Sequence, residues 1–380
     1  MSHPQDDNRA AGPNATGCFT AGPVLGRSDD ATHDETAGAA HGNPLGAFYR
    51  GQSVMVTGGL GFIGSNLARR LAADGARVTI VDSRVPGCGA NPFNVAGIEG
   101  SVTVHEIDLR DNGAIVPLVK EQAFIFNLAG QVSHIDSMRD PLQDLEINCR
   151  SHLSLLEACR HHRPDVRLFY AGTRQQYGRP LRLPVDEAHP SNPTDVNGIN
   201  KMSAEWYHLL YHRVHGLRAC SLRLTNTFGP RQLLEHARQG FLSVFIRKAL
   251  EGGTIQVYGD GSQLRDFNYV DDVVDAFRLA GAREEVFGEV YNLGSPEVLS
   301  VKQVAEMLIE IAGAGAIEII PFPDDRKRID IGSYYGSFAK IHRQLGWSPR
   351  VTVADGLRRT LAYYREHKHH YYEETPGAQI

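Results

Sequence analysis

A glycine-rich segment, Thr57–Gly64 (TGGLGFIG), lies between a short apolar run and a segment with helical spacing. In that setting Gly58 permits a tight turn, Gly61 lets the backbone approach a pyrophosphate, and Gly64 lets a helix pack closely on a strand. The N-terminus of the helix offers free N–H groups and a partial positive charge to the pyrophosphate. Asp82 ends the next apolar run, where a carboxylate accepts hydrogen bonds from both ribose hydroxyls and repels a 2′-phosphate. The pattern predicts a site for NAD rather than NADP.

Short apolar runs alternate with helical patterns as far as residue 225. The runs are Ser53–Thr57, Arg77–Asp82, Val102–Glu106, Ala123–Asn127, Arg167–Ala171 and Arg218–Arg223, and the helical patterns include Phe62–Asp74, Leu142–Arg160 and Ile199–His215. Strands that alternate with helices form βαβ units and a parallel sheet covered on both faces. We therefore predict an α/β fold, with a doubly wound parallel Rossmann sheet over residues 48–225.

Beyond residue 225 the alternation loosens and the elements become shorter. Helical patterns continue at Phe241–Glu251, Val270–Ala280 and Val353–His367. We predict that residues 226–370 form mainly a smaller C-terminal α/β lobe on the carboxyl edge of the sheet, with later segments returning to the Rossmann domain. Residues 1–47 carry few large apolar side chains and cannot offset the entropy of ordering, so we predict a disordered N-terminal tail.

The composition is that of an ordinary globular protein and narrows the possible functions. Of the 380 residues 42% are hydrophobic, the net charge is −5 and no basic block occurs, which argues against a nucleic-acid or membrane partner. No apolar run reaches the roughly 18–20 residues that span a bilayer. The five cysteines lack CxxC spacing and no metal motif occurs, so we expect no disulfide framework and no metal site. A cytoplasmic location without a secretory signal is expected.

Six motifs follow one another between about Ser53 and Tyr364. They are TGGLGFIG at 57–64, Asp108-Leu109, NLAG at 127–130, YAGTRQQYG at 170–178, LRLTNTFGP at 222–230 and RDFNYVDD at 265–272. In this order they resemble the extended short-chain dehydrogenase/reductase family, the NAD-dependent nucleotide-sugar epimerases and dehydratases. The resemblance implies a Rossmann domain that holds NAD, a C-terminal lobe that binds a nucleoside-diphosphate sugar, and a homodimer formed through helices at about 142–160 and 199–215.

The resemblance also implies which residues contact the ligands. The expected NAD contacts are Gly58, Gly61, Phe62, Ile63, Gly64, Asp82, Asp108, Leu109, Leu128, Ala129, Gly130 and Lys201. Asn226 is implied to contact the diphosphate of the sugar nucleotide, and Arg265 to clamp a phosphate, since a guanidinium fork matches a phosphate bidentately. Arg231 and Arg328 are further candidates for binding an anion.

The catalytic residues of the family are a Ser or Thr and a Tyr-x-x-x-Lys motif. Thr173 and Lys201 match the first and last of these, but Asn197 stands where the tyrosine is expected. In the family the phenolate takes the hydroxyl proton as hydride leaves, and an amide cannot titrate. Tyr177 and His134 are therefore candidates for the general base, and a water held by Asn197 and Lys201 is a third.

The loop after Thr173 bears on the type of reaction. Arg174-Gln175 stands where 4,6-dehydratases of the family carry Asp-Glu, and the glutamate usual in decarboxylases is also missing. We therefore expect an NAD-dependent epimerase that oxidises a sugar carbon, most often C4, to a transient ketone and returns the hydride to its other face. The alternatives are an NDP-sugar dehydratase, decarboxylase or reductase, and a non-catalytic protein that binds NAD and a sugar nucleotide. Arg174 is suited to bind a carboxylate on the sugar, so a uronic acid is a further possible substrate.

Overall fold

The computed structural model describes residues 44–234 and 240–372. The predicted disordered tail therefore lies outside the described residues up to residue 43. Residues 44–47, which we assigned to that tail, instead begin helix α1 (Pro44–Tyr49). The helix is held because the Tyr49 ring packs on Phe124 and its hydroxyl donates a 2.7 Å hydrogen bond to the Arg278 carbonyl oxygen.

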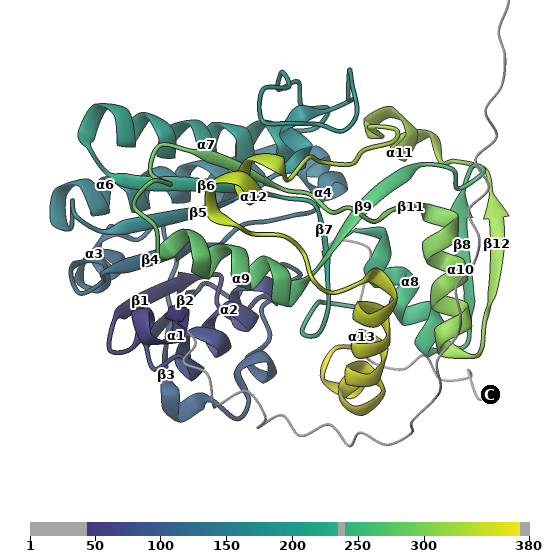
Figure 1. The fold of residues 1–380 in the computed structure, drawn as a ribbon, viewed down its shortest axis with the longest axis horizontal. Helices are drawn as coiled ribbons and strands as arrows, with labels where there is room; N and C mark the ends of the chain where they lie inside the picture. Colours follow the sequence, from purple (N-terminus) through teal and green to yellow (C-terminus); the bar gives the residue numbers. More distant parts are fainter. Residues whose placement is uncertain (1–43, 235–239, 373–380) are drawn as a thin grey trace, which may run out of the picture. The chain divides into compact units, whose positions relative to one another are not determined.

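A seven-stranded parallel sheet organises the first part of the chain (Figure 1). Its strands are β1 (Ser53–Thr57), β2 (Arg77–Asp82), β3 (Val102–Glu106), β4 (Phe124–Asn127), β5 (Arg167–Thr173), β6 (Arg218–Leu224) and β10 (Val290–Leu293). They lie in the order β10-β6-β5-β4-β1-β2-β3. The order reverses between β1 and β4, which is the switch point of a doubly wound Rossmann sheet. The predicted fold class is confirmed.

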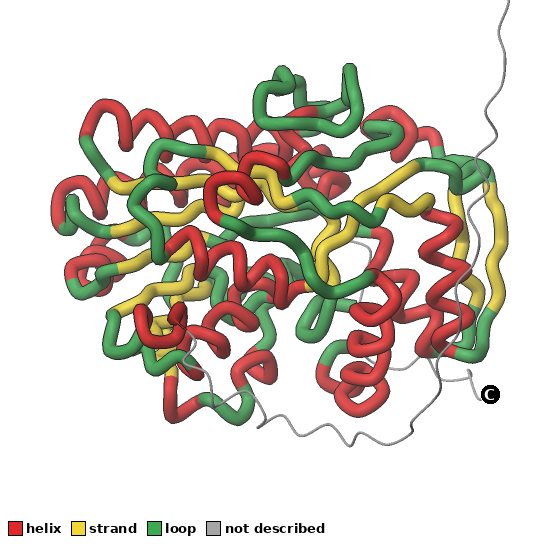
Figure 2. The backbone as a smooth tube through the Cα atoms, in the orientation of Figure 1, coloured by secondary structure: helices red, strands yellow, loops and turns green. Residues whose placement is uncertain are grey.

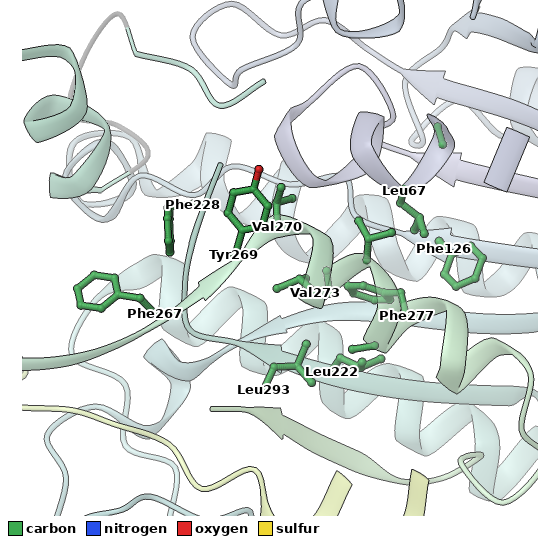
Figure 3. Close-up of a cluster of buried hydrophobic side chains, with 14 of the residues drawn as sticks. Leu67, Phe126, Leu222, Phe228, Phe267, Tyr269, Val270, Val273, Phe277 and Leu293 are labelled. Atoms are coloured by element: carbon green, nitrogen blue, oxygen red, sulfur yellow. The ribbon is translucent and has the colours of Figure 1, made fainter. Parts of the chain in front are cut away.

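Helices cover both faces of this sheet (Figure 2). One face carries α2 (Phe62–Ala73) and α9 (Val270–Gly281), and the other carries α3 (Asn112–Lys120), α6 (Ser151–His162) and α7 (Val196–His215). Alternate strand residues serve the two faces: Val56 belongs to the core on the α2 side and Met55 to the core on the α6 side. Figure 3 shows the first core, where Val273 and Phe277 of α9 pack among side chains of the sheet.

The C-terminal part of the chain contributes to two regions. A three-stranded sheet holds β11 (Val298–Ser300), β9 (Leu264–Tyr269) and β7 (Asn226–Phe228), and a two-stranded sheet pairs β12 (Ala316–Ile320) with β8 (Thr254–Tyr258). The helices around them are α8 (Phe241–Leu250), α10 (Val301–Ala312), α11 (Asp324–Ile329) and α13 (Val353–His367), whereas α12 (Ala339–Leu345) packs on β10 of the large sheet. Meanwhile β10 pairs with β6 and α9 packs on α2, so both belong to the Rossmann domain.

The connection from β4 to β5 differs from the single helix that we predicted at 142–160. It consists of α4 (His134–Arg139), α5 (Pro141–Leu145), a π-helical turn at Glu146–Arg150 and α6. A π-helical turn inserts an extra residue into a helix and often marks a functional site. Within the described ranges, no helix is long and apolar enough to cross a membrane, and no group of three His, Cys, Asp or Glu side chains is placed to hold a metal ion.

Candidate active site

A cleft of about 680 Å³ lies over the carboxyl ends of the parallel strands. Its lining comes from the segments that follow β1, β4, β5 and β6, from the first turns of α7, and from β9 and α11 of the C-terminal lobe. Open α/β sheets bind ligands at this edge, next to the switch point. The cleft thus joins the glycine loop, the Thr173 region and the cationic side of the lobe in one space.

The glycine loop packs so closely on neighbouring backbone that side chains would not fit at Gly58 and Gly64. A Cβ atom at Gly64 would lie 2.2 Å from the Gly58 carbonyl oxygen, and one at Gly58 would lie 2.9 Å from the Ala129 Cα atom. Gly61 precedes α2 and supplies no side-chain cap, so the first N–H groups of the helix face the cleft without a side-chain acceptor. This geometry fits the pyrophosphate of a dinucleotide.

Asp82 lies at the end of β2 in the same cleft. Its Oδ2 accepts a 3.1 Å hydrogen bond from the Leu60 N–H and its Oδ1 a 2.9 Å bond from the Arg84 N–H. Burial raises the pKa of Asp82, and the two backbone hydrogen bonds oppose that rise. These hydrogen bonds hold the glycine loop and the Asp82 carboxylate in place, which fits the predicted hydrogen bonds between Asp82 and the ribose hydroxyls.

The remaining residues predicted to contact NAD also line the cleft. They are Phe62, Ile63, Asp108, Leu109, Leu128, Ala129, Gly130 and Lys201. Asp108 pairs with Arg110 at 2.6 Å, and this hydrogen bond lowers the pKa of its carboxyl group. Gly130 passes so close to α7 that a Cβ there would lie 3.4 Å from Lys201 Nζ.

Lys201 lies in the first turns of α7, which begins after the N-cap residue Asp195. Its Nζ is 5.0 Å from the centre of the Tyr170 ring. Burial lowers the pKa of Lys201 to about 8, and the nearby charges of Asp144 and Glu205 limit that fall. The cleft therefore holds a desolvated ammonium group beside the loop that follows β4.

Asn197 lines the cleft, but its side-chain amide forms hydrogen bonds to other residues of the protein. Its Nδ2 donates to the Gln131 carbonyl oxygen at 2.8 Å and to Asp144 Oδ2 at 3.2 Å. The buried Asp144 carboxylate also accepts from Asn148 and Asn200, at 3.0 and 2.8 Å. We missed this cluster of one carboxylate and three amides, because Asp144 carries no signal in the sequence that connects it with α7.

Tyr177, one of the two predicted candidate bases, does not line the cleft. Its side chain is fully buried outside the cleft lining, and its hydroxyl donates to Asn292 Oδ1 at 2.7 Å and accepts from Arg223. Burial raises the pKa of Tyr177 to about 12. Thr173, in contrast, ends β5 within the lining, where its Oγ1 accepts from the Gln175 N–H at 3.2 Å.

His134 is the other predicted candidate, and it lines the cleft at the start of α4. Its Nδ1 lies 2.9 Å from Oδ2 of the buried Asp195. Gln175, two residues after Thr173, reaches the same carboxylate oxygen with its Nε2 at 3.4 Å. The structure therefore brings His134 and the loop that follows Thr173 together around Asp195.

Arginines supply positive charge at the lobe side of the cleft, among them Arg265 and Arg174. Arg265 donates to the carbonyl oxygens of Leu264 and Gly332 and lies 3.5 Å from Asp330. Burial and then the charge of Arg174 lower the pKa of Arg265 to about 10. Arg174 donates to Asn226 Oδ1 at 3.1 Å, so the predicted diphosphate contact Asn226 also holds a guanidinium.

Two predicted anion-binding arginines lie outside the cleft lining. Arg231 donates to Asn66 Oδ1 at 2.8 Å and stacks over the Tyr363 ring, so its guanidinium is used in packing. Arg328 is exposed on α11, whereas Arg326 of the same helix lines the cleft. Arg326 and Ile329 are three residues apart and share a helical face, a spacing that could have identified the cleft side of α11.

A dinucleotide-dependent enzyme is the class of protein that this fold and cleft define. A sequence model of the NAD dependent epimerase/dehydratase family matches residues 54–294. The chain belongs to this family of extended short-chain dehydrogenases/reductases, whose cofactor is NAD. The glycine loop at the N-terminus of α2 and the Asp82 carboxylate fit that cofactor.

Similar proteins include several that act on nucleotide sugars. A putative UDP-glucose 4-epimerase of Methanocaldococcus jannaschii is 30% identical, over 82% of this chain and 98% of its own length. UDP-glucuronic acid decarboxylase 1 of Xenopus tropicalis is 31% identical, over 83% and 73%. The structure of a dTDP-glucose 4,6-dehydratase from Streptomyces venezuelae with NAD bound superposes with a TM-score of 0.77, at 27% identity over 85% and 99%. The relatives thus catalyse different reactions.

Proposed function

We propose that this protein is an NAD-dependent epimerase of a nucleoside-diphosphate sugar and that it acts at C4. The supporting observation is the set of acidic groups in the cleft. Among the described lining residues the carboxylates are Asp82 and Asp108 at the nucleotide end and Asp330 beside Arg265. Elimination of water needs an acid and a base beside the sugar ring. Arg174 and Gln175 follow Thr173 there, which favours epimerisation over dehydration.

In this proposal, bound NAD supplies the hydride acceptor and donor, and the protein positions the sugar. The Thr173 hydroxyl donates a hydrogen bond to the oxygen of the reacting carbon. The Lys201 ammonium group holds the nicotinamide ribose hydroxyls and stabilises negative charge on the reacting oxygen in a site with little water. Asn197 keeps the start of α7 in register through Gln131 and Asp144.

The direct test is incubation of the purified protein with UDP-, GDP-, CDP- and dTDP-sugars, followed by mass spectrometry and NMR. Epimerisation gives a product of unchanged mass with an inverted ring carbon. Loss of water or carbon dioxide would replace the proposal by a dehydratase or a decarboxylase. A protein that binds these compounds and NAD without changing any of them would be a non-catalytic binding protein.

One observation favours a substrate with a carboxylate on the sugar. The Arg174 guanidinium stacks 5.0 Å from the centre of the Tyr334 ring, and it donates hydrogen bonds to the neutral Gln175 and Asn226 side chains. No ion pair to Arg174 is found among the described residues. A guanidinium that lines a cleft beside Thr173 is suited to bind a carboxylate bidentately. We therefore include nucleotide-linked uronic acids as substrates, with decarboxylation as the second candidate reaction.

Arg174→Gln tests the choice of substrate. We expect about a 10- to 100-fold loss of affinity for UDP-glucuronic acid and a smaller loss for UDP-glucose, measured by calorimetry, because a charged hydrogen bond contributes about 1.5–3 kcal/mol. The control is Arg182→Gln, an exposed arginine outside the cleft. An equal effect of Arg174→Gln on both ligands would assign Arg174 to the diphosphate.

A homodimer through α7 is part of the proposal. Ile199, Trp206, Leu210 and Val214 are exposed on this helix, and their spacing aligns them in one stripe. Exposed apolar surface of this extent marks an interaction site. In light scattering, the double variant Trp206→Glu/Leu210→Glu should be a monomer. Leu181→Glu, at an exposed leucine in the loop between η4 (Arg174–Tyr177) and α7, should leave the mass unchanged.

A further inference from the structure

We propose that His134, oriented by Asp195, is the general base that replaces the missing tyrosine. The inference rests on the proposed function, since a base is required only if a sugar hydroxyl is oxidised. Its basis is the contact between a cleft-lining imidazole and a buried carboxylate at the N-cap of α7. Asp195 acts through His134 and is a positioning residue.

The imidazole is held in place by both of its neighbouring helices. His134 is the first residue of α4, after the N-cap Ser133, whose side chain accepts from the Asp136 N–H. Ser137 of the same helix accepts a hydrogen bond from the Asn197 N–H at 3.2 Å, which ties α4 to α7. The His134 side chain is 35% exposed, so it contacts the cleft while its Nδ1 side is turned to the protein.

Asp195 determines the tautomer of the ring. Its side chain is 1% exposed, and its Oδ1 accepts from the Gly198 N–H at 2.7 Å. Burial works to raise the pKa of Asp195, but the hydrogen bonds from His134, Gly198 and Gln175 outweigh it and lower the pKa. Gln175 Nε2 also lies 3.3 Å from His134 Nδ1, but the Asp195 carboxylate is closer, at 2.9 Å, and is charged. The carboxylate therefore accepts the Nδ1 proton, which leaves the lone pair of Nε2 to accept a proton. No described residue hydrogen-bonds that Nε2.

The other charged groups near the His134 ring are two cations of the cleft lining and an ion pair on α4. Arg174 from η4 and Lys201 from α7 line the same cleft, and their positive charges help a proton leave a hydroxyl group. On α4 itself Asp136 and Arg139 form a pair with each other at 3.8 Å. Asp195 is thus the carboxylate that contacts the imidazole, within the part of the chain that the structure describes.

Competing bases are less well placed. His152 and His208 are fully buried against Asn127 and do not line the cleft, and burial lowers the pKa of each. Asp144 accepts hydrogen bonds from three amides and also lies outside the lining. Tyr177 is buried, as described above. His134 is thus the candidate base that lines the cleft beside the Thr173 loop.

In the proposed step a proton and a hydride leave the sugar and both later return to it. The sugar O–H bond breaks and its proton goes to His134 Nε2. The electron pair of the C–H bond leaves as hydride to NAD⁺, and a C=O bond forms. After the ketone has turned, hydride returns to the opposite face of the carbon and the oxygen takes the proton back from His134 Nε2–H. The negative charge of Asp195 stabilises the imidazolium that exists between the two halves.

The test compares His134→Asn, His134→Ala and Asp195→Asn with a control, His162→Ala, which changes an exposed histidine at the end of α6. Asparagine can still cap a helix, so Asp195→Asn keeps the N-cap of α7. We expect His134→Asn to lower kcat by about 10²–10⁴-fold with little change in KM, and imidazole to rescue His134→Ala. Asp195→Asn should also lower kcat with little change in KM, because His134 Nδ1 loses its charged hydrogen-bond acceptor. The control should match the unchanged protein.

A second measurement does not depend on turnover. Nitrogen NMR of ¹⁵N-histidine-labelled protein reports which ring nitrogen carries the proton, and we expect Nδ1–H for His134 and loss of this preference in Asp195→Asn. An Nε2–H tautomer, or a His134→Asn variant with full activity, would overturn the assignment. If the unchanged protein alters none of the sugar nucleotides, the proposed function fails, and the NMR result still decides whether the His134–Asp195 contact exists.

Discussion

The two ends of the cleft are built to hold anions in different ways. At the nucleotide end the donors are backbone N–H groups of the glycine loop and of the first turn of α2. At the lobe end they are the guanidinium groups of Arg174 and Arg265. Backbone donors are fixed by local geometry, whereas guanidinium groups depend on partners far away in the chain, such as Asp330 and Asn226. We therefore expect substitutions at the two ends to fail in different ways.

The largest effect should come from between the two ends, at Lys201. Lys201→Ala should abolish turnover, because it removes the ammonium group that holds the nicotinamide ribose and stabilises the reacting oxygen. Steady-state assays with the substrate found in the panel check this. The matched control is Lys248→Ala, at a lysine that lines the cleft from α8 and pairs with Glu251. Turnover by Lys201→Ala at the rate of the unchanged protein would remove Lys201 from the proposed mechanism.

At the nucleotide end, Gly64→Ala should nearly abolish NAD binding. The new Cβ would meet the Gly58 carbonyl oxygen at 2.2 Å, which no side-chain movement can relieve because the obstacle is backbone. Displacement of the loop removes several donors at once, so we expect at least a 100-fold weaker affinity for NAD⁺ by calorimetry. Gly97→Ala is not an equal control because Gly97 has a positive φ; Gly100→Ala, with open space around it, is the matched variant. Unchanged affinity in Gly64→Ala would contradict the loop geometry.

The nucleotide end was also the part that the sequence predicted best. The glycine loop and Asp82 interact over short distances in the chain, and each glycine meets a local steric demand. The contact between His134 and Asp195 joins segments separated by helix α6 and strand β5, and no pattern in either segment predicts that they meet. The same is true of Asp144, whose amide partners lie on α7 and in the π-helical turn. Such side-chain clusters are determined by tertiary packing rather than by periodicity.

The pH dependence of turnover should report the charge of Lys201, which lies between the two ends of the cleft. Burial lowers the pKa of Lys201 from 10.5 to about 8, so the ammonium group is present below pH 8 and is lost as the pH rises through that value. Turnover should therefore fall about tenfold for each pH unit well above 8. Lys201→Arg should remove this alkaline limb while it lowers the rate, since a guanidinium stays charged. A limb that persists in Lys201→Arg would belong to another group.

The smallest catalytic effect should come from Tyr177, because its hydroxyl belongs to a buried hydrogen-bond network that lies apart from the cleft. Tyr177→Phe removes the hydroxyl that joins Asn292 to the ion pair of Arg223 and Glu205. Leaving these buried polar groups with one partner fewer should lower the free energy of unfolding by about 1–3 kcal/mol. Because Tyr177 does not line the cleft, kcat should stay within about twofold of the unchanged protein. Urea unfolding and steady-state kinetics on one preparation distinguish the two effects. A large fall in kcat with unchanged stability would return Tyr177 to the list of possible bases and weaken the case for His134.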